Sequence, residues 1–235
     1  MGKVISLINL QGTVGDYTFV KSRRYGDHIR AKRGTHKKAK LNKSFKEQIK
    51  KIPGANLHAK IFKDAINPYR RKWEDGTMWN RLISMFMKQF DVHGAFDFSK
   101  LEPFEIHDHY TLEKLINMES EIGPDKKRSR LHVNLSYVMH PVFRKKSLRD
   151  GYQLGVIGVF PDLKKKSAKV VSEYSNVISL SGKVEPFNIE LPIPQGAKTF
   201  LVCVSIHGCS KGKPDGPMTT KGMRMIQAGE LYLPH

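Results

Sequence analysis

The chain has 235 residues and a formal net charge of +19, because 41 Lys and Arg stand against 22 Asp and Glu. This excess excludes the near-neutral profile of an ordinary soluble domain and favours a polyanionic partner. With 39% hydrophobic and 27% charged residues, the composition excludes both a disordered and a membrane-like chain, and the length suits one large domain or two small ones.

The charge is concentrated near the N-terminus. Residues 1–72 carry 19 Lys and Arg against 4 Asp and Glu, a net charge of +15, whereas residues 73–235 carry 22 against 18, a net charge of +4. Such asymmetry indicates contact with nucleic acid or an anionic surface. A solvated basic face is the alternative.

Residues 4–33 predict β structure. Aromatic and apolar side chains alternate over residues 17–21, a turn follows at residues 23–26, and a second strand covers residues 28–32, as in a β-hairpin. Gly12 and Gly15 precede it, where a bulge or a close backbone approach favours residues without Cβ. The almost uniformly basic residues 30–40 predict an exposed arm or a surface lying on a partner.

From Asn42 the hydrophobic period becomes helical and predicts three amphipathic helices. Pro53 and Gly54 are expected to end the first, and Pro68 the second. Helical spacing assigns the aromatic residues to packing, with base stacking as the alternative for Trp73 and Trp79. The stripes that define the helices are Leu41, Phe45, Ile49 and Ile52; then Leu57, Ile61, Phe62, Ala65, Ile66 and Tyr69; then Trp79, Ile83, Phe86 and Phe90.

A short helical signal at residues 111–118 and a turn at residues 123–130 precede a β-rich half. We place a domain boundary in that turn, with a basic hairpin, arm and helical region over residues 1–125 and a β-sandwich over residues 126–235. Strands separated by Gly, Pro, Asp and Ser are typical of an antiparallel immunoglobulin-like sandwich, so the predicted fold class is α+β. The strands are expected at residues 131–137, 152–160, 170–174, 177–180, 187–191, 199–207 and 223–233.

The N-terminal hairpin resembles that of uncharacterised proteins of Bacteroidota bacteria. The resemblance rests on Gly and aromatic positions followed by a Lys-rich helix, over about the first quarter of the chain. It implies a bacterial source and an architecture, and it implies no site or function. The residues that carry it are Gly12, Gly15, Tyr17, Phe19, Lys21, Gly26, Ile29, Arg30, Arg33 and Gly34.

Two groups of residues suggest a metal site. His107 and His109 share one face if they lie on a strand, and Glu105 would join them as a third ligand. Cys203, His207 and Cys209 offer thiolate and imidazole ligands without a clear fourth. Neither group is complete at a known spacing, so we predict no metal and no cofactor, and ordinary buried cysteines remain the alternative.

Motifs of reaction chemistry are lacking, so the sequence predicts no enzyme. It contains no Gly-x-Ser-x-Gly elbow, and the dipeptide at Gly182 and Lys183 lacks the rest of a phosphate loop. The Gly- and Lys-rich residues 208–222 offer backbone amides that suit phosphate, but a long loop between strands is the preferred interpretation.

The predicted site is therefore the basic hairpin and arm. Phosphate recognition needs several cations without strict spacing, because counterion release supplies much of the affinity. Arginine suits phosphate oxygens and a tyrosine offers a stacking face, so backbone contacts with little sequence preference are expected. The predicted nucleic-acid-binding residues are Arg23, Arg24, Tyr25, Arg30, Lys32, Arg33, Lys37, Lys38 and Lys40.

These observations predict a non-enzymatic protein that binds the backbone of DNA or RNA, or an acidic protein partner. A structural subunit of a bacterial or phage-derived assembly, homo- or hetero-oligomeric, is the alternative, and a hydrolase or metalloenzyme a distant third. With 2 cysteines, no signal peptide and no apolar run long enough to span a bilayer, a reduced cytoplasmic location is expected.

Overall fold

A computed structural model describes most of the chain, in two compact units, Met1–Lys46 and Glu47–His235. Each unit is described by itself. The described residues are 2–3, 11–22, 26–32, 42–70, 75–91, 95–140, 150–181, 184–214 and 220–231.

The N-terminal unit holds a four-stranded antiparallel sheet in the order β1-β4-β3-β2. The predicted hairpin is confirmed, since β3 pairs with β4 from Tyr17↔Ala31 to Val20↔His28. Gly15, with a φ of 56°, lies in the tight turn between β2 and β3, so it provides a left-handed conformation and not the close approach expected. The strands are β1 (Gly2–Lys3), β2 (Gly12–Val14), β3 (Tyr17–Val20) and β4 (His28–Ala31).

Helix α1 (Lys43–Ile66) is continuous, so the expectation of two helices separated by Pro53 and Gly54 is wrong. Gly54 lies in the helix because the ring of Phe90 packs against it, and an added Cβ would come within 2.7 Å of that ring. Pro53 lies on the exposed side, and the buried residues after it, from Ala55 onward, hold the helix against the core.

The apolar stripe at the start of α1 is not buried. Phe45 is 54% exposed, and Ile49 and Ile52 are each 40% exposed. The packing role expected for this stripe is therefore wrong for the described residues, and Leu41 lies outside them. Helix α2 (Met78–Lys88) confirms the third predicted helix, and its apolar face packs in the core.

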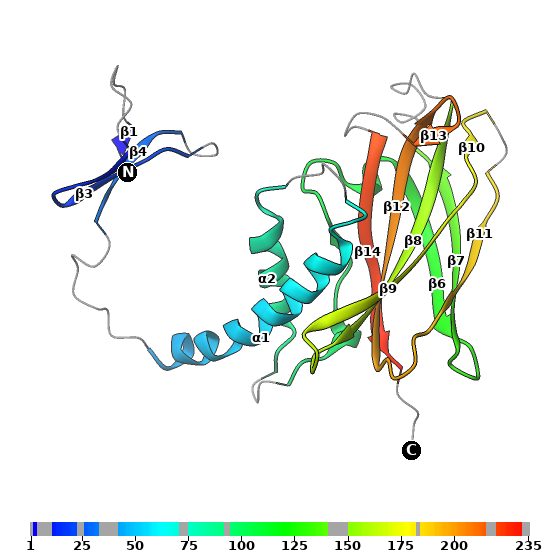
Figure 1. The fold of residues 1–235 in the computed structure, drawn as a ribbon, viewed down its shortest axis with the longest axis horizontal. Helices are drawn as coiled ribbons and strands as arrows, with labels where there is room; N and C mark the ends of the chain where they lie inside the picture. The colour runs from blue at the N-terminus through cyan, green and yellow to red at the C-terminus, as the bar shows by residue number, and fades with distance from the viewer. Residues whose placement is uncertain are drawn as a thin grey trace. The chain divides into compact units, whose positions relative to one another are not determined.

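The second unit has three layers (Figure 1). Helices α1 and α2 cover one face of a seven-stranded antiparallel sheet, and a three-stranded sheet in the order β11-β7-β6 covers the other. The seven-stranded sheet is formed by β5 (Phe104–Glu105), β8 (Gly151–Asp162), β9 (Ser167–Tyr174), β10 (Ile178–Ser179), β12 (Thr199–Ser210), β13 (Lys213–Pro214) and β14 (Lys221–Glu230). The three-stranded sheet is formed by β6 (Ile116–Pro124), β7 (Arg130–Met139) and β11 (Phe187–Pro192).

Alternation along the central strands divides the core into two clusters. In β12, Leu201 and Cys203 pack toward the helices, whereas Val202 and Val204 pack toward the three-stranded sheet. Because both faces are covered, β8 and β12 are almost wholly buried. Each strand predicted after residue 130 has a counterpart in the structure, the last ending at Glu230, with residues 232 and 233 outside the described part. Antiparallel sheets with two helices establish the α+β class.

The predicted boundary at residues 125/126 is wrong, because the turn there is a hairpin within one sheet. Strand β6 pairs with β7 from Ile116↔Met139 to Pro124↔Leu131, and Asp125 accepts hydrogen bonds that close the turn. The chain divides into its two compact units between residues 46 and 47 instead. The helix expected at residues 111–118 is only the short η2 (Leu112–Lys114), because pairing with β7 draws the residues from Ile116 into a strand.

Gly222 of β14 lies close to η2, and replacing it tests the packing between these two elements. An added Cβ would lie 2.9 Å from the Cα of Leu112, a backbone atom that cannot move aside easily. We expect Gly222→Ala to lower the free energy of unfolding by about 1–3 kcal/mol. Gly123→Ala, with nothing within 4 Å of the added Cβ, is the control, measured by urea denaturation. Equal effects would show that η2 does not pack against β14.

His58 generates a second prediction, because it is buried among phenylalanines. Its ring stacks on Phe96 at a centroid distance of 4.0 Å, and burial lowers its pKa from 6.5 to about 4. Between these two pKa values the unfolded chain binds a proton at His58 and the folded chain does not. The free energy of unfolding is therefore unaffected by this group above pH 6.5 and decreases as the pH falls toward 4.

Replacing His58 by Phe should remove up to about 3 kcal/mol of this acid-dependent loss. The measurement is urea denaturation of both proteins at a series of pH values. His109→Phe, at a side chain that is 81% exposed, should keep the loss. An unchanged pH dependence in His58→Phe would contradict the burial of a neutral imidazole.

Candidate functional site

The structure describes two of the nine predicted nucleic-acid-binding residues. Arg30 lies exposed in β4 opposite Thr18, and Lys32 is exposed directly after the strand, where its backbone N–H donates to the carbonyl oxygen of Asp16 at 2.7 Å. The other seven, Arg23, Arg24, Tyr25, Arg33, Lys37, Lys38 and Lys40, lie outside the described residues.

Further cations accompany these two. Lys21 is exposed after β3, and Lys43, Lys46 and Lys50 are exposed along the start of α1. Within the described residues, neither Arg30 nor any of these lysines joins an ion pair. Lys51 differs, because its Nζ donates to the carbonyl oxygen of Phe90 at 2.8 Å. The exposed cations are available to an external anion without first breaking an internal contact.

A separate polar cluster joins α2 to β5. Arg81 donates from Nη2 to Asp75 at 2.6 Å, from Nη1 to the carbonyl oxygen of Glu105 at 2.9 Å, and from Nη2 to that of Ile106 at 3.2 Å. The Asp75 side chain is only 3% exposed. Burial alone would raise the pKa of Asp75, but hydrogen bonds from Thr77 and Arg81 and the charge of Arg81 lower it to about 2.

The residues around this cluster bear on the first metal hypothesis, in which Glu105, His107 and His109 would bind one ion. His107 is buried while His109 is 81% exposed, and Glu105 turns toward Leu112 and Arg224 instead of joining them. The predicted trio therefore does not converge. Among the described residues, the one group whose ligand atoms lie within 4.8 Å of one another is Asp75, His107 and Asp108.

These donor atoms already have partners. Nδ1 of His107 accepts the backbone N–H groups of His109 and Tyr110, at 3.1 and 3.3 Å, and burial lowers the pKa of His107. Asp75 accepts from Thr77 and Arg81, and Thr77 also donates to Asp108 at 3.1 Å. A guanidinium holds the position beside Asp75 that a cation would take, so the cluster acts as a structural link between α2 and β5.

The second metal hypothesis concerns three residues of β12. Cys203 is wholly buried in the helix-facing cluster, and burial raises the pKa of its thiol. Burial lowers the pKa of His207 to about 4. Cys209 donates through Sγ to the carbonyl oxygen of His207 at 3.6 Å. Both cysteines are buried and neither forms a disulfide, which matches the alternative of ordinary core cysteines.

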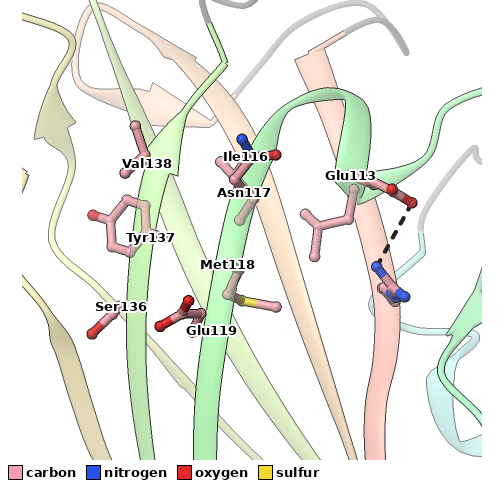
Figure 2. Close-up of a pocket in the computed structure, with 10 residues that line it drawn as sticks. Glu113, Ile116, Asn117, Met118, Glu119, Ser136, Tyr137 and Val138 are labelled. Carbon is pink, nitrogen blue, oxygen red and sulfur yellow. Dashed lines mark ion pairs between the residues drawn. The ribbon is translucent and has the colours of Figure 1, made fainter.

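A groove of about 540 Å³ is lined by residues of η2, β6 and β7 (Figure 2). Arg224 of β14 also lines it. Arg224 lies 3.9 Å from Glu113 and 3.7 Å from the partly buried Glu105, and this burial raises the pKa of Glu105. The groove mixes carboxylates with apolar side chains such as Ile116 and Met118. No sequence signal pointed to it, because Glu113 and Arg224 lie far apart along the chain.

The structure also bears on the predicted loop at residues 208–222 and on the two tryptophans. Residues 208–210 extend β12, Lys213–Pro214 form β13 and β14 begins at Lys221, so much of the expected loop at residues 208–222 is sheet. Residues 215–219 lie outside the described part. Trp79 is half-buried against the core with Nζ of Lys63 5.3 Å from its ring centroid, which confirms its packing role, and Trp73 is outside the described residues.

No protein family, curated protein or solved structure matches this chain. Within the described residues, no helix combines the length and apolar character needed to cross a membrane.

The link between α2 and β5 generates a pH-dependent prediction. The pKa of Asp75 is about 2 in the folded chain against 3.8 ordinarily, so its ionisation stabilises the fold above pH 3.8, and this is lost as the pH falls to about 2. We expect Asp75→Asn to lower the free energy of unfolding by about 2 kcal/mol at pH 7, with the difference from wild type shrinking below pH 4.

Urea denaturation across the acid range measures this effect. Asp64→Asn, at an exposed position of α1, is the matched control and should change stability by less than about 0.5 kcal/mol. A pH-independent difference for Asp75→Asn would mean that packing, and not charge, accounts for the contribution of Asp75.

Proposed function

We propose that this chain is a non-enzymatic nucleic-acid-binding protein that contacts the sugar-phosphate backbone through its basic N-terminal unit and the start of α1, with little sequence preference. The supporting observation is the set of exposed cations at Lys21, Arg30, Lys43, Lys46 and Lys50, none of which joins an ion pair within the described residues. Phosphates can neutralise such cations and release counterions.

Charge counts favour the N-terminal unit over the rest. Met1–Lys46 carry 12 Lys and Arg against 2 Asp and Glu, a net charge of +10 in 46 residues. The remaining residues carry 29 against 20, a net charge of +9 over a far larger surface. The higher density near the N-terminus is the property that concentrates a polyanion.

The larger unit would serve as a rigid body of immunoglobulin-like kind. Its sheets run β6-β7-β11 and β9-β8-β12-β14. In chain order these correspond to strands A-B-E and C′-C-F-G of an immunoglobulin-like sandwich. The helices and β5 are additions to that plan. In this proposal the sandwich holds the binding elements in place, an analogy at the level of the fold.

A second candidate function is a structural subunit of a large assembly. The exposed apolar stripe of Phe45, Ile49 and Ile52 favours it, because apolar side chains at helical spacing are typical of a helix that docks on another protein. The lack of a disulfide between the two cysteines supports a reduced location, and we propose the cytoplasm in either case.

Salt titration tests the nucleic-acid proposal. Affinity for an unrelated duplex or single strand should fall linearly in log K against log salt, as counterion release requires. Reversing Lys21, Arg30 and Lys32 to Glu should reduce the slope by about 3 and weaken binding by at least about tenfold at low salt. The readout is fluorescence anisotropy on the full chain.

Reversal of Lys164, Lys165 and Lys169, which are exposed at the β8–β9 hairpin, changes the net charge equally and is the matched control. It should leave most of the affinity intact. Equal losses in both variants would show that overall charge acts without a site, and no binding at low salt would reject nucleic acid as the ligand.

A further inference from the structure

The sheet of the N-terminal unit separates apolar from polar side chains. Directly paired residues of antiparallel strands lie on one face, so Val14, Tyr17 and Ala31 share a face. Phe19 and Ile29 lie on that same face, because Phe19 follows Tyr17 by two residues along β3. The opposite face carries Thr13, Thr18, Val20, His28 and Arg30.

The apolar face is largely open to solvent. Val14 is 66% exposed and Tyr17 is 60% exposed, while Phe19 and Ile29 are half-buried. A sheet with strands of two to four residues has little core of its own, and an apolar face normally needs a cover to contribute stability. A ligand that covers Tyr17 and Phe19 would supply that missing contact.

We propose that this face is a stacking platform for single-stranded nucleic acid, an inference that rests on the proposed function. Tyr17 and Phe19 lie two residues apart on one strand, which separates their positions by about 6.6 Å. Bases stacked within a duplex are about 3.4 Å apart, so each ring can take one base only if the bases are unstacked from each other. The spacing therefore selects a single strand over a duplex.

Charge favours a nucleic acid over other covers of this face. Lys21 is exposed immediately after β3, next in the alternation that places Tyr17 and Phe19, so a cation lies at the end of the aromatic pair. A second copy of this chain would bring another N-terminal unit of net charge +10 against the first and be repelled. Phosphates joined to bases satisfy both the cations and the rings.

The test compares Tyr17→Ala with wild type, using the full chain and a labelled oligothymidine of about 15 nucleotides. Loss of one stacked base should weaken single-strand binding by at least about fivefold. The salt slope should stay unchanged, because no cation is removed. Tyr17→Phe should bind within about twofold of wild type, and a duplex should bind all three proteins alike.

Thr18→Ala is the control on the opposite face of the same strand, and it should leave the single-strand affinity within about twofold of wild type. Thermal unfolding followed by circular dichroism checks that the variants keep their fold, which the exposure of Tyr17 makes an expected result.

Other outcomes overturn the platform. If Tyr17→Ala binds the single strand as wild type does, with the salt dependence intact, cations alone bind the ligand and the proposed function stands without the platform. If light scattering shows that Tyr17→Ala dissociates an oligomer, the face is a protein interface. If no protein binds nucleic acid at low salt, the proposed function fails as well.

Discussion

Burial of both faces of β8 and β12 is the constraint on which the second unit depends. A strand with solvent on one side can tolerate polar residues at alternate positions, but these strands contact helices on one face and a sheet on the other. Each apolar residue along them therefore fills one of two cores. The positions of α1, α2, β6 and β7 follow from the need to cover both sides of the same strands, and the polar link at Asp75 and Arg81 holds α2 to one end of that arrangement.

The two units are built on different principles. The larger unit packs its core side chains in two clusters, and the part-buried pair of Asp75 and Arg81 links its elements. The described part of the smaller unit exposes cations together with the apolar side chains of Val14 and Tyr17. The packing of the larger unit stabilises its fold, whereas the smaller unit has exposed groups that can contact another molecule. Net charge per residue is also higher in the smaller unit than in the larger one.

Sequence reasoning located elements whose signal is local and failed where distant residues decide. Alternation in residues 131–137 revealed β7, because one face of that strand is buried and the other is exposed. Pro53 and Gly54 looked like a helix end, since nothing in the local pattern shows that Phe90 packs on Gly54. The hydrogen bonds from Arg81 to the carbonyl oxygens of Glu105 and Ile106, and the groove at Arg224, join segments far apart in the chain, so no spacing rule could reveal them. The predicted cations are supported only at Arg30 and Lys32, because the rest of that set lies outside the described residues.

Helix α1 is covered by core contacts over only part of its length, and Pro53 removes one N–H from its backbone hydrogen-bond ladder near the point where that cover begins. The turns that include Ala55, Ala59 and Phe62 cannot open without opening the core. The turns that include Phe45 and Ile49 contribute no buried residue among those the structure describes, so they can fray while the core stays closed. One helix thus contains two levels of local stability, and a partner that binds its first turns would spend part of its binding free energy on ordering them.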